Sequence, residues 1–183
     1  MSDAAPRFAD PFDLLVQIES QVRAARLDVA AGQAQNWVGL GFGLGEHWLV
    51  TPKDDVREVI TVPTLTRVPG AKPWLLGLAN VRGGLLPVCD LRRLLETESA
   101  SPPTRNSRVL VYNSERRPAG FLVDEVAGYR QFTPAEQDRD ARATCGLPSH
   151  AVVGAFARDG QTWLAVSLHR IATVEAFLQA GAN

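Results

Sequence analysis

The stretch of sequence that decides the fold runs from residue 74 to residue 92 and is WLLGLANVRGGLLPVCDLR. Two short apolar runs, residues 78–82 and 85–89, flank Gly83-Gly84, and such a dipeptide is typical of two-residue β-hairpin turns. The pattern therefore predicts a β-hairpin. Because proline has no backbone N–H to donate, we expect Pro87 to place the second strand at a sheet edge or a bulge.

Similar β-type runs extend from this hairpin in both directions. Upstream, residues 37–43 and 48–51 flank a turn at 44–47, and a third run covers 56–62. Downstream, the runs are residues 108–113, 120–126, 152–158 and 162–168, and Asp159-Gly160 is a second strong turn signal. About ten short strands without alternating long helices predict an all-β protein built as small barrels or a sandwich.

A few short segments depart from the β pattern. We expect Asp90 to cap a short helix that contains Leu91, and residues 133–136 to form a capped helical turn. Residues 137–148 are predicted to be a flexible polar connection, and residues 170–180 a C-terminal helix.

The first 36 residues have a helical rather than a β-type pattern of apolar residues. Asp10-Pro11 is a good helix start, and apolar residues then recur at three-four spacing, which predicts an amphipathic helix of roughly 20 residues. Two interpretations stay open for this helix: it packs on its own domain, or it docks on a partner.

Composition limits the class of protein. Of the 183 residues, 45% are hydrophobic and 21% charged, with a formal net charge of −1, which is typical of a soluble globular protein. The pattern shows neither a secretion signal nor a run long enough to span a bilayer, so we expect no membrane insertion. Cys89 and Cys145 are expected to be reduced thiols, which favours the cytoplasm.

The sequence offers no support for catalysis. The chain has no Gly-Lys pair for a phosphate-binding loop, and its only lysines are Lys53 and Lys72. The alternating glycines of residues 39–45 do not match GxGxxG; they more simply let another backbone or a large ring such as Trp48 approach closely. The three histidines, at 47, 150 and 169, have no metal-ligand spacing. We therefore expect no enzyme activity, no cofactor and no metal.

The quoted stretch, together with the strand at 56–60, closely resembles the signature of the CheW family, the adaptors that couple chemoreceptors to a histidine kinase. The shared features are the V-x-E strand, a Pro followed by a hydrophobic G-x-x-N-x-R-G turn, and the P-V-x-D-L-R that follows it. The resemblance continues in residues 108–111 and 120–126 and covers roughly residues 37–178.

The resemblance implies a fold of two small five-stranded, SH3-like barrel subdomains that share an apolar interior. Residues 37–178 would form this CheW-like domain, with residues 1–36 as an N-terminal helical extension and residues 179–183 as a tail. The opening of the chain, residues 11–15, resembles that of the CheW-like proteins of twitching motility.

The function that the resemblance implies is a non-enzymatic adaptor in a chemosensory array that controls type IV pilus twitching motility. Its partners would be the tip of a methyl-accepting chemoreceptor and the regulatory domain of a CheA-type histidine kinase. The protein would be cytoplasmic and recruited to membrane-bound arrays. Two alternatives remain: a CheW-like structural or regulatory binder outside motility, and a small β-barrel nucleic-acid binder. The balanced charge disfavours the second.

The same resemblance implies the site residues. Glu58 and Arg82 match family positions that interact at the surface where the receptor and the kinase are coupled. Asn80 would bond the backbone of the turn. The other residues expected around this partner-binding patch are Val56, Gly77 and Val81.

Overall fold

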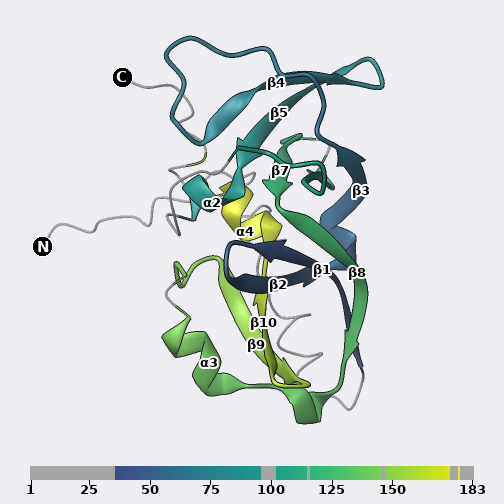
Figure 1. Ribbon diagram of the computed structural model, residues 1–183, viewed down its shortest axis with the longest axis vertical. Helices are drawn as coiled ribbons and strands as arrows, with labels where there is room; N and C mark the ends of the chain where they lie inside the picture. The colour runs from purple at the N-terminus through teal and green to yellow at the C-terminus, as the bar shows by residue number, and fades with distance from the viewer. Residues whose placement is uncertain (1–35, 96–101, 115, 146, 174–176, 178–183) are drawn as a thin grey trace, which may run out of the picture.

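A computed structural model describes residues 36–95, 102–114, 116–145, 147–173 and 177 of the chain. These residues form ten β-strands in two five-stranded sheets, with only short helices between them (Figure 1). The predicted all-β class is therefore confirmed. The amphipathic helix predicted within residues 1–36 lies outside the described residues.

The first sheet forms barrel B, drawn in the upper half of Figure 1. Its strand order is β3-β6-β7-β5-β4, with one parallel pair, β5 and β7. The chain leaving β3 crosses to β4, where Thr66 and Leu78 exchange backbone hydrogen bonds of 2.8 and 2.9 Å. This bridge joins the two edges of the sheet. The strands are β3 (Val56–Thr61), β4 (Leu75–Val81), β5 (Gly84–Asp90), β6 (Arg108–Tyr112) and β7 (Gly120–Val123).

The second sheet forms barrel A, in the order β8-β1-β2-β10-β9, with β2 and β10 as its parallel pair. A bridge between Gln137 and Phe156 joins its edges. One predicted strand, residues 120–126, proves to be parts of two strands, because the chain passes at Asp124 from β7 in barrel B to β8 in barrel A. The strands are β1 (Trp37–Leu44), β2 (His47–Pro52), β8 (Glu125–Phe132), β9 (Val152–Arg158) and β10 (Gln161–Val166).

The two barrels have the same arrangement of strands. Each has an edge strand, then an antiparallel pair, then a parallel contact with the second strand of a further hairpin. They differ in where the chain enters this arrangement. Barrel B is built from consecutive strands, β3 to β7, whereas barrel A is built from β1 and β2 together with β8 to β10.

Apolar side chains gather in three clusters. The largest lies between the barrels and includes Phe42, Leu49, Leu110, Phe121 and Leu164, all almost fully buried. Smaller clusters fill the interior of each barrel, around Val88 and Val109 in barrel B and around Phe132 and Trp163 in barrel A. The central strands are thus buried on both faces, which explains why they are continuous apolar runs in the sequence.

Hydrogen bonds fix the barrels relative to one another. In the β1–β2 turn of barrel A, the Gly45 N–H donates to a carboxylate oxygen of Asp124 at 2.7 Å. Arg92, at the start of the helix after β5, donates to the same carboxylate from its Nε at 3.1 Å. Reciprocally, the N–H of Asn113, after β6 of barrel B, donates to the carbonyl of Asp55 at 2.9 Å.

The hairpin at the centre of the quoted stretch forms, but its turn is Arg82-Gly83 rather than Gly83-Gly84. Val81 pairs with Gly84, and both turn residues have positive φ, 54° and 82°, as a type I′ turn requires. Of the two places expected for Pro87, the sheet edge is wrong, because β5 lies between β4 and β7, but the β4–β5 ladder has a bulge close to it, between Leu75 and Gly77. Leu78 lies opposite Pro87, and its N–H and C=O both form hydrogen bonds with Thr66 rather than with β5. The β4–β5 ladder therefore needs no N–H from Pro87 at this position.

The short helices follow their capping residues. Asp90 caps α2 (Leu91–Leu94) as predicted, accepting hydrogen bonds from the N–H groups of Arg92 and Arg93. The turn predicted at 133–136 is a 3-10 helix, η2 (Pro134–Glu136), and a second one, η1 (Lys53–Asp55), follows β2.

The polar connection predicted at 137–148 contains a helix that was not predicted. It contains α3 (Arg139–Thr144), because the Asp138 carboxylate accepts from the N–H groups of Asp140 and Ala141, both at 3.0 Å. Of the C-terminal helix predicted at 170–180, the structure describes α4 (Leu168–Thr173) and Phe177.

The alternating glycines of β1 make room for rings inside barrel A. A Cβ on Gly39 would lie 2.6 Å from the Trp37 ring, and one on Gly41 would lie 2.8 Å from the Trp163 ring. The close approach of a large ring is therefore confirmed. Trp48 makes only an ordinary contact, 3.7 Å from a Cβ on Gly43.

Candidate partner-binding surface

Two charged residues far apart in the sequence meet at one end of barrel B. Arg82 lies in the β4–β5 turn, and its Nη2 is 2.7 Å from Oε2 of Glu58 on β3. Glu58 follows a β-bulge at the start of β3, and its side chain is only 17% exposed. The Arg82 side chain is 80% exposed. The carboxylate is thus set into the barrel while the guanidinium lies largely in solvent.

Asn80 orders the turn that carries Arg82. Its side-chain oxygen accepts a hydrogen bond from the Gly83 N–H at 3.0 Å, which confirms the expected bond to the turn backbone. Because Arg82 itself has a positive φ, its direction depends on this turn. Asn80 is itself exposed. Glu58, Asn80 and Arg82 therefore form one surface feature, which we call the hairpin-tip surface.

The other three expected residues lie beneath this surface or away from it. Gly77 is buried at a β-bulge with φ 154°, and a Cβ there would be 2.6 Å from the carbonyl oxygen of Thr66. Val81 packs against the interior of barrel B, and Val56 packs against the cluster between the barrels. These positions support the strands, and the structure does not bring them to the exposed face with Arg82.

Two exposed apolar residues belong to the same strands but were not predicted. Leu85 is 65% exposed and pairs with Asn80 across the hairpin, and Val59, next to Glu58, is 39% exposed. The sequence signal was the alternation along β5, where Leu86 and Val88 point into barrel B and Leu85 points outward. Because successive side chains of a strand point to opposite faces, Val59 lies on the other face of β3 from Glu58, whereas Leu85 shares its face of the hairpin with Asn80.

The ion pair adds little to folding stability. Exposed pairs of this kind contribute about 0–1 kcal/mol, because solvent screens the charges and two long side chains must be ordered. The Arg82 guanidinium, which is 80% exposed, keeps N–H groups that can donate to solvent or to another molecule.

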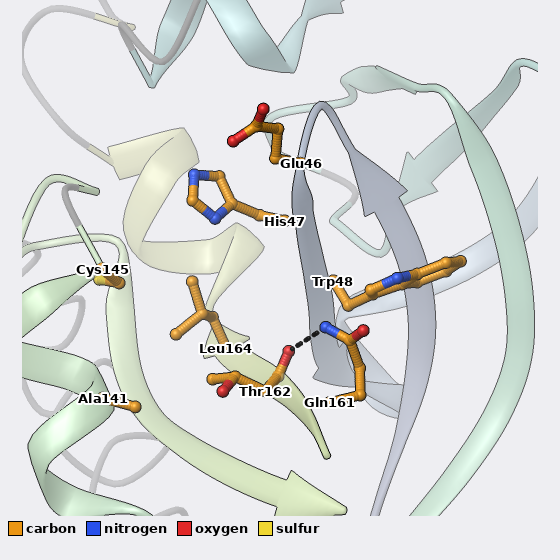
Figure 2. A pocket seen from close by; sticks show the side chains of 8 residues that line it. All are labelled: Glu46, His47, Trp48, Ala141, Cys145, Gln161, Thr162 and Leu164. Carbon is orange, nitrogen blue, oxygen red and sulfur yellow. Dashed lines mark hydrogen bonds between the residues drawn. The ribbon is translucent and has the colours of Figure 1, made fainter. Parts of the chain in front are cut away.

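Barrel A also carries a depression on its surface (Figure 2). It has a volume of about 230 Å³ and lies between the β1–β2 turn, α3 and the start of β10, with His47 and Cys145 on its walls. The part of the chain that the structure describes contains no group of three His, Cys, Asp or Glu side chains able to hold a metal ion.

The other cysteine of the chain, Cys89, is almost fully buried. Burial, reinforced by the neighbouring Asp90 carboxylate, raises the pKa of the Cys89 thiol to about 12.

None of the helices within the described ranges is long and apolar enough to cross a membrane.

Comparison with known proteins places this geometry in a family. The family model described as the CheW-like domain matches residues 38–176. The chain belongs to the CheW-like domain family. Two five-stranded sheets and the hairpin-tip surface are thus features of a CheW-like protein.

Individual CheW-like proteins are similar over different lengths. Protein PilI of Pseudomonas aeruginosa is 41% identical over 173 residues, which cover 92% of this chain and 94% of PilI. The chemotaxis protein CheW of Klebsiella aerogenes is 30% identical over 64% of this chain and 69% of its own length. The crystal structure of the scaffolding protein TtCheW from Thermoanaerobacter tengcongensis has a TM-score of 0.67 at 22% identity, covering 77% of this chain and 95% of TtCheW.

Proposed function

We propose that this CheW-like protein is a non-enzymatic adaptor of a chemosensory array that controls type IV pilus twitching motility. The similarity to PilI over nearly the whole of both chains supports the choice of subfamily. The observation that carries the proposal is the hairpin-tip surface, in which an ordered turn presents Arg82 beside the exposed Leu85.

The adaptor couples two partners, the tip of a methyl-accepting chemoreceptor and the regulatory domain of a CheA-type histidine kinase. Two barrels of the same architecture, held together by a continuous apolar cluster, support an adaptor that holds two partners in a set geometry. Residues 37–178 form the working unit, residues 1–36 an extension and residues 179–183 a tail. The protein is cytoplasmic and reaches the membrane only through its receptors.

The partner-binding residues are Glu58, Asn80 and Arg82, supported from below by Val56, Gly77 and Val81. Arg82 contacts the partner directly, Asn80 orders its turn, and Glu58 orients its guanidinium. In this proposal the ion pair with Glu58 serves to position Arg82 for the partner, and it is not only a structural contact.

A charge-swap experiment tests that division. Arg82→Glu should abolish retention of the kinase and receptor in a pull-down from native cytosol, and should abolish twitching. The double variant Glu58→Arg with Arg82→Glu restores an ion pair but presents the opposite charge to the partner, so it should remain defective. Arg139→Glu, at an exposed position on α3 of barrel A, is the matched control and should behave as wild type.

Circular dichroism of each variant gives the second readout. A folded Arg82→Glu protein that loses both partners supports the proposal. Recovery of binding in the double variant would assign the pair a structural role only. Wild-type bait that retains neither a histidine kinase nor a chemoreceptor would overturn the adaptor function.

A further inference from the structure

A second feature of barrel B lies at the other end of β4 from Arg82. The segment that joins β3 to β4 and the start of α2 enclose an open depression of about 400 Å³. Arg67, Lys72 and Arg93 line it, together with Pro69, Gly70 and Pro73. Because β4 has seven residues, this depression is about 20 Å along the strand from the hairpin tip.

The charge in the depression is largely unneutralised. Arg93 is the only one of the three cations with a carboxylate nearby among the described residues: its Nε is 3.5 Å from the buried carboxylate of Asp90. Within the same described ranges, no carboxylate lies within 4.0 Å of the side-chain nitrogens of Arg67 or Lys72. By contrast, Arg82 and Arg158 each pair with a glutamate.

The frame that carries these cations is stiff. Pro69 and Pro73 restrict the backbone, and the carbonyl of Pro73 accepts a hydrogen bond of 2.8 Å from Nη1 of Arg93. The Asp90 N–H donates to the Trp74 carbonyl at 2.8 Å, and the Thr66–Leu78 bridge holds the other end of the segment. A site that is already ordered loses little entropy when a ligand binds.

We propose that this basic depression docks an acidic peptide segment of a partner protein, through contacts of Arg67, Lys72 and Arg93 with its carboxylates. The charged donors are the three side chains, since the lining prolines have no N–H and the N–H groups of Ala71 and Leu75 are bonded to the carbonyls of Val68 and Lys72. Three cations spread over a concave surface match the successive carboxylates of an acidic peptide, and this shape does not fit a flat bilayer.

The two lysines of the chain allow a matched test. The full-length, 15N-labelled protein is titrated with a hexaglutamate peptide at about 50 mM salt while its amide resonances are followed. We expect saturable shifts centred on Gly70, Ala71 and Lys72. Lys72→Glu should weaken binding about tenfold, whereas Lys53→Glu, at an exposed position of η1, should change it less than twofold.

Three outcomes would overturn the proposal. The first is that the peptide produces no saturable shifts in this segment. The second is that Lys53→Glu weakens binding as much as Lys72→Glu does. The third is that inorganic phosphate or phosphatidylserine vesicles produce the same shifts at lower concentration. Arg82→Glu serves as an internal comparison, because it should leave hexaglutamate binding unchanged. Failure of this docking site is therefore distinguishable from failure of the hairpin-tip surface.

Discussion

Glu136 and Arg158 form a charged pair at the far end of barrel A. Nη2 of Arg158 donates to Oε2 of Glu136 at 2.8 Å, and the Thr133 N–H donates to the same oxygen at 2.7 Å. The hydrogen bond from Arg158 is the largest cause that lowers the pKa of Glu136, and the one from the Thr133 N–H is the next; together they hold it at about 2. The pair joins η2 to β9, the two segments that close barrel A.

This pKa predicts how stability depends on pH. Because the folded-state pKa of Glu136 lies below its ordinary value of 4.5, its carboxylate stabilises the fold above pH 4.5, and this contribution is lost as the pH falls towards 2. Glu136→Gln should therefore unfold at lower urea concentration than wild type at pH 7, and the difference should shrink at pH 3.

Glu125→Gln on β8 removes one carboxylate from the same barrel without touching Arg158, and serves as the control for net charge. If Glu136→Gln lowers the urea midpoint equally at pH 7 and at pH 3, the ionised carboxylate is not what stabilises this end of the barrel.

Substitutions at two glycines of the β4–β5 hairpin should distinguish the cost of backbone strain from that of a steric clash. Gly83 has φ 82° with open space around its Cβ position, whereas Gly77 combines φ 154° with the Thr66 oxygen at 2.6 Å. Gly83→Ala should cost about 1–2 kcal/mol of unfolding free energy, the usual penalty of a left-handed conformation. Gly77→Ala should exceed the roughly 1–3 kcal/mol of strain alone, because the Thr66 bridge must also shift.

Urea denaturation of both variants measures the two costs. Equal costs would mean that the close approach at Thr66 relaxes freely. Hydrogen exchange at the Thr66 and Leu78 amides gives an independent readout, since only Gly77→Ala should expose them.

The elements that local chemistry determines could be predicted from the sequence. Asp159-Gly160 forms the predicted turn, and Asp90 caps the predicted helix. The turn at Arg82-Gly83 was misplaced by one residue, because Gly83 can serve in either of two adjacent turns and the apolar pattern of the two strands does not distinguish them. The start of α3 could also have been predicted, because Asp138 is a favoured N-cap residue.

The site was predictable to a similar extent. The motif brought Glu58 and Arg82 together, and the structure places them 2.7 Å apart. It could not separate exposed Asn80 from buried Gly77, because both belong to the same motif. The basic depression was not predicted at all, since Arg67 and Lys72 meet Arg93 only after the chain has passed through two further strands.

At the scale of the whole molecule, the shared apolar cluster predicts that the two barrels unfold together. Phe121 of β7 is fully buried in this cluster, where it meets side chains from both barrels. Phe121→Ala should cost about 3–5 kcal/mol and lower the stability of the entire domain. Leu85→Ala, at an exposed position, should change the stability by no more than about 0.5 kcal/mol.

Two probes check this cooperativity. Trp37, Trp48 and Trp163 lie in barrel A, so tryptophan fluorescence reports chiefly on that barrel, while far-ultraviolet circular dichroism reports on both. The two transitions should coincide for wild type and for Phe121→Ala. Separate midpoints would mean that the barrels are independent folding units.

The different entry points of the chain into the two barrels affect the order in which they form during synthesis. All five strands of barrel B have been made before β8 of barrel A, so barrel B can assemble on the ribosome while β1 and β2 still lack their partners. Until then, the apolar side of β1 and β2 is exposed and must be protected by barrel B or by a chaperone. The nascent chain is thus most vulnerable to aggregation between the synthesis of β2 and that of β10, when the parallel pair that completes barrel A at last forms.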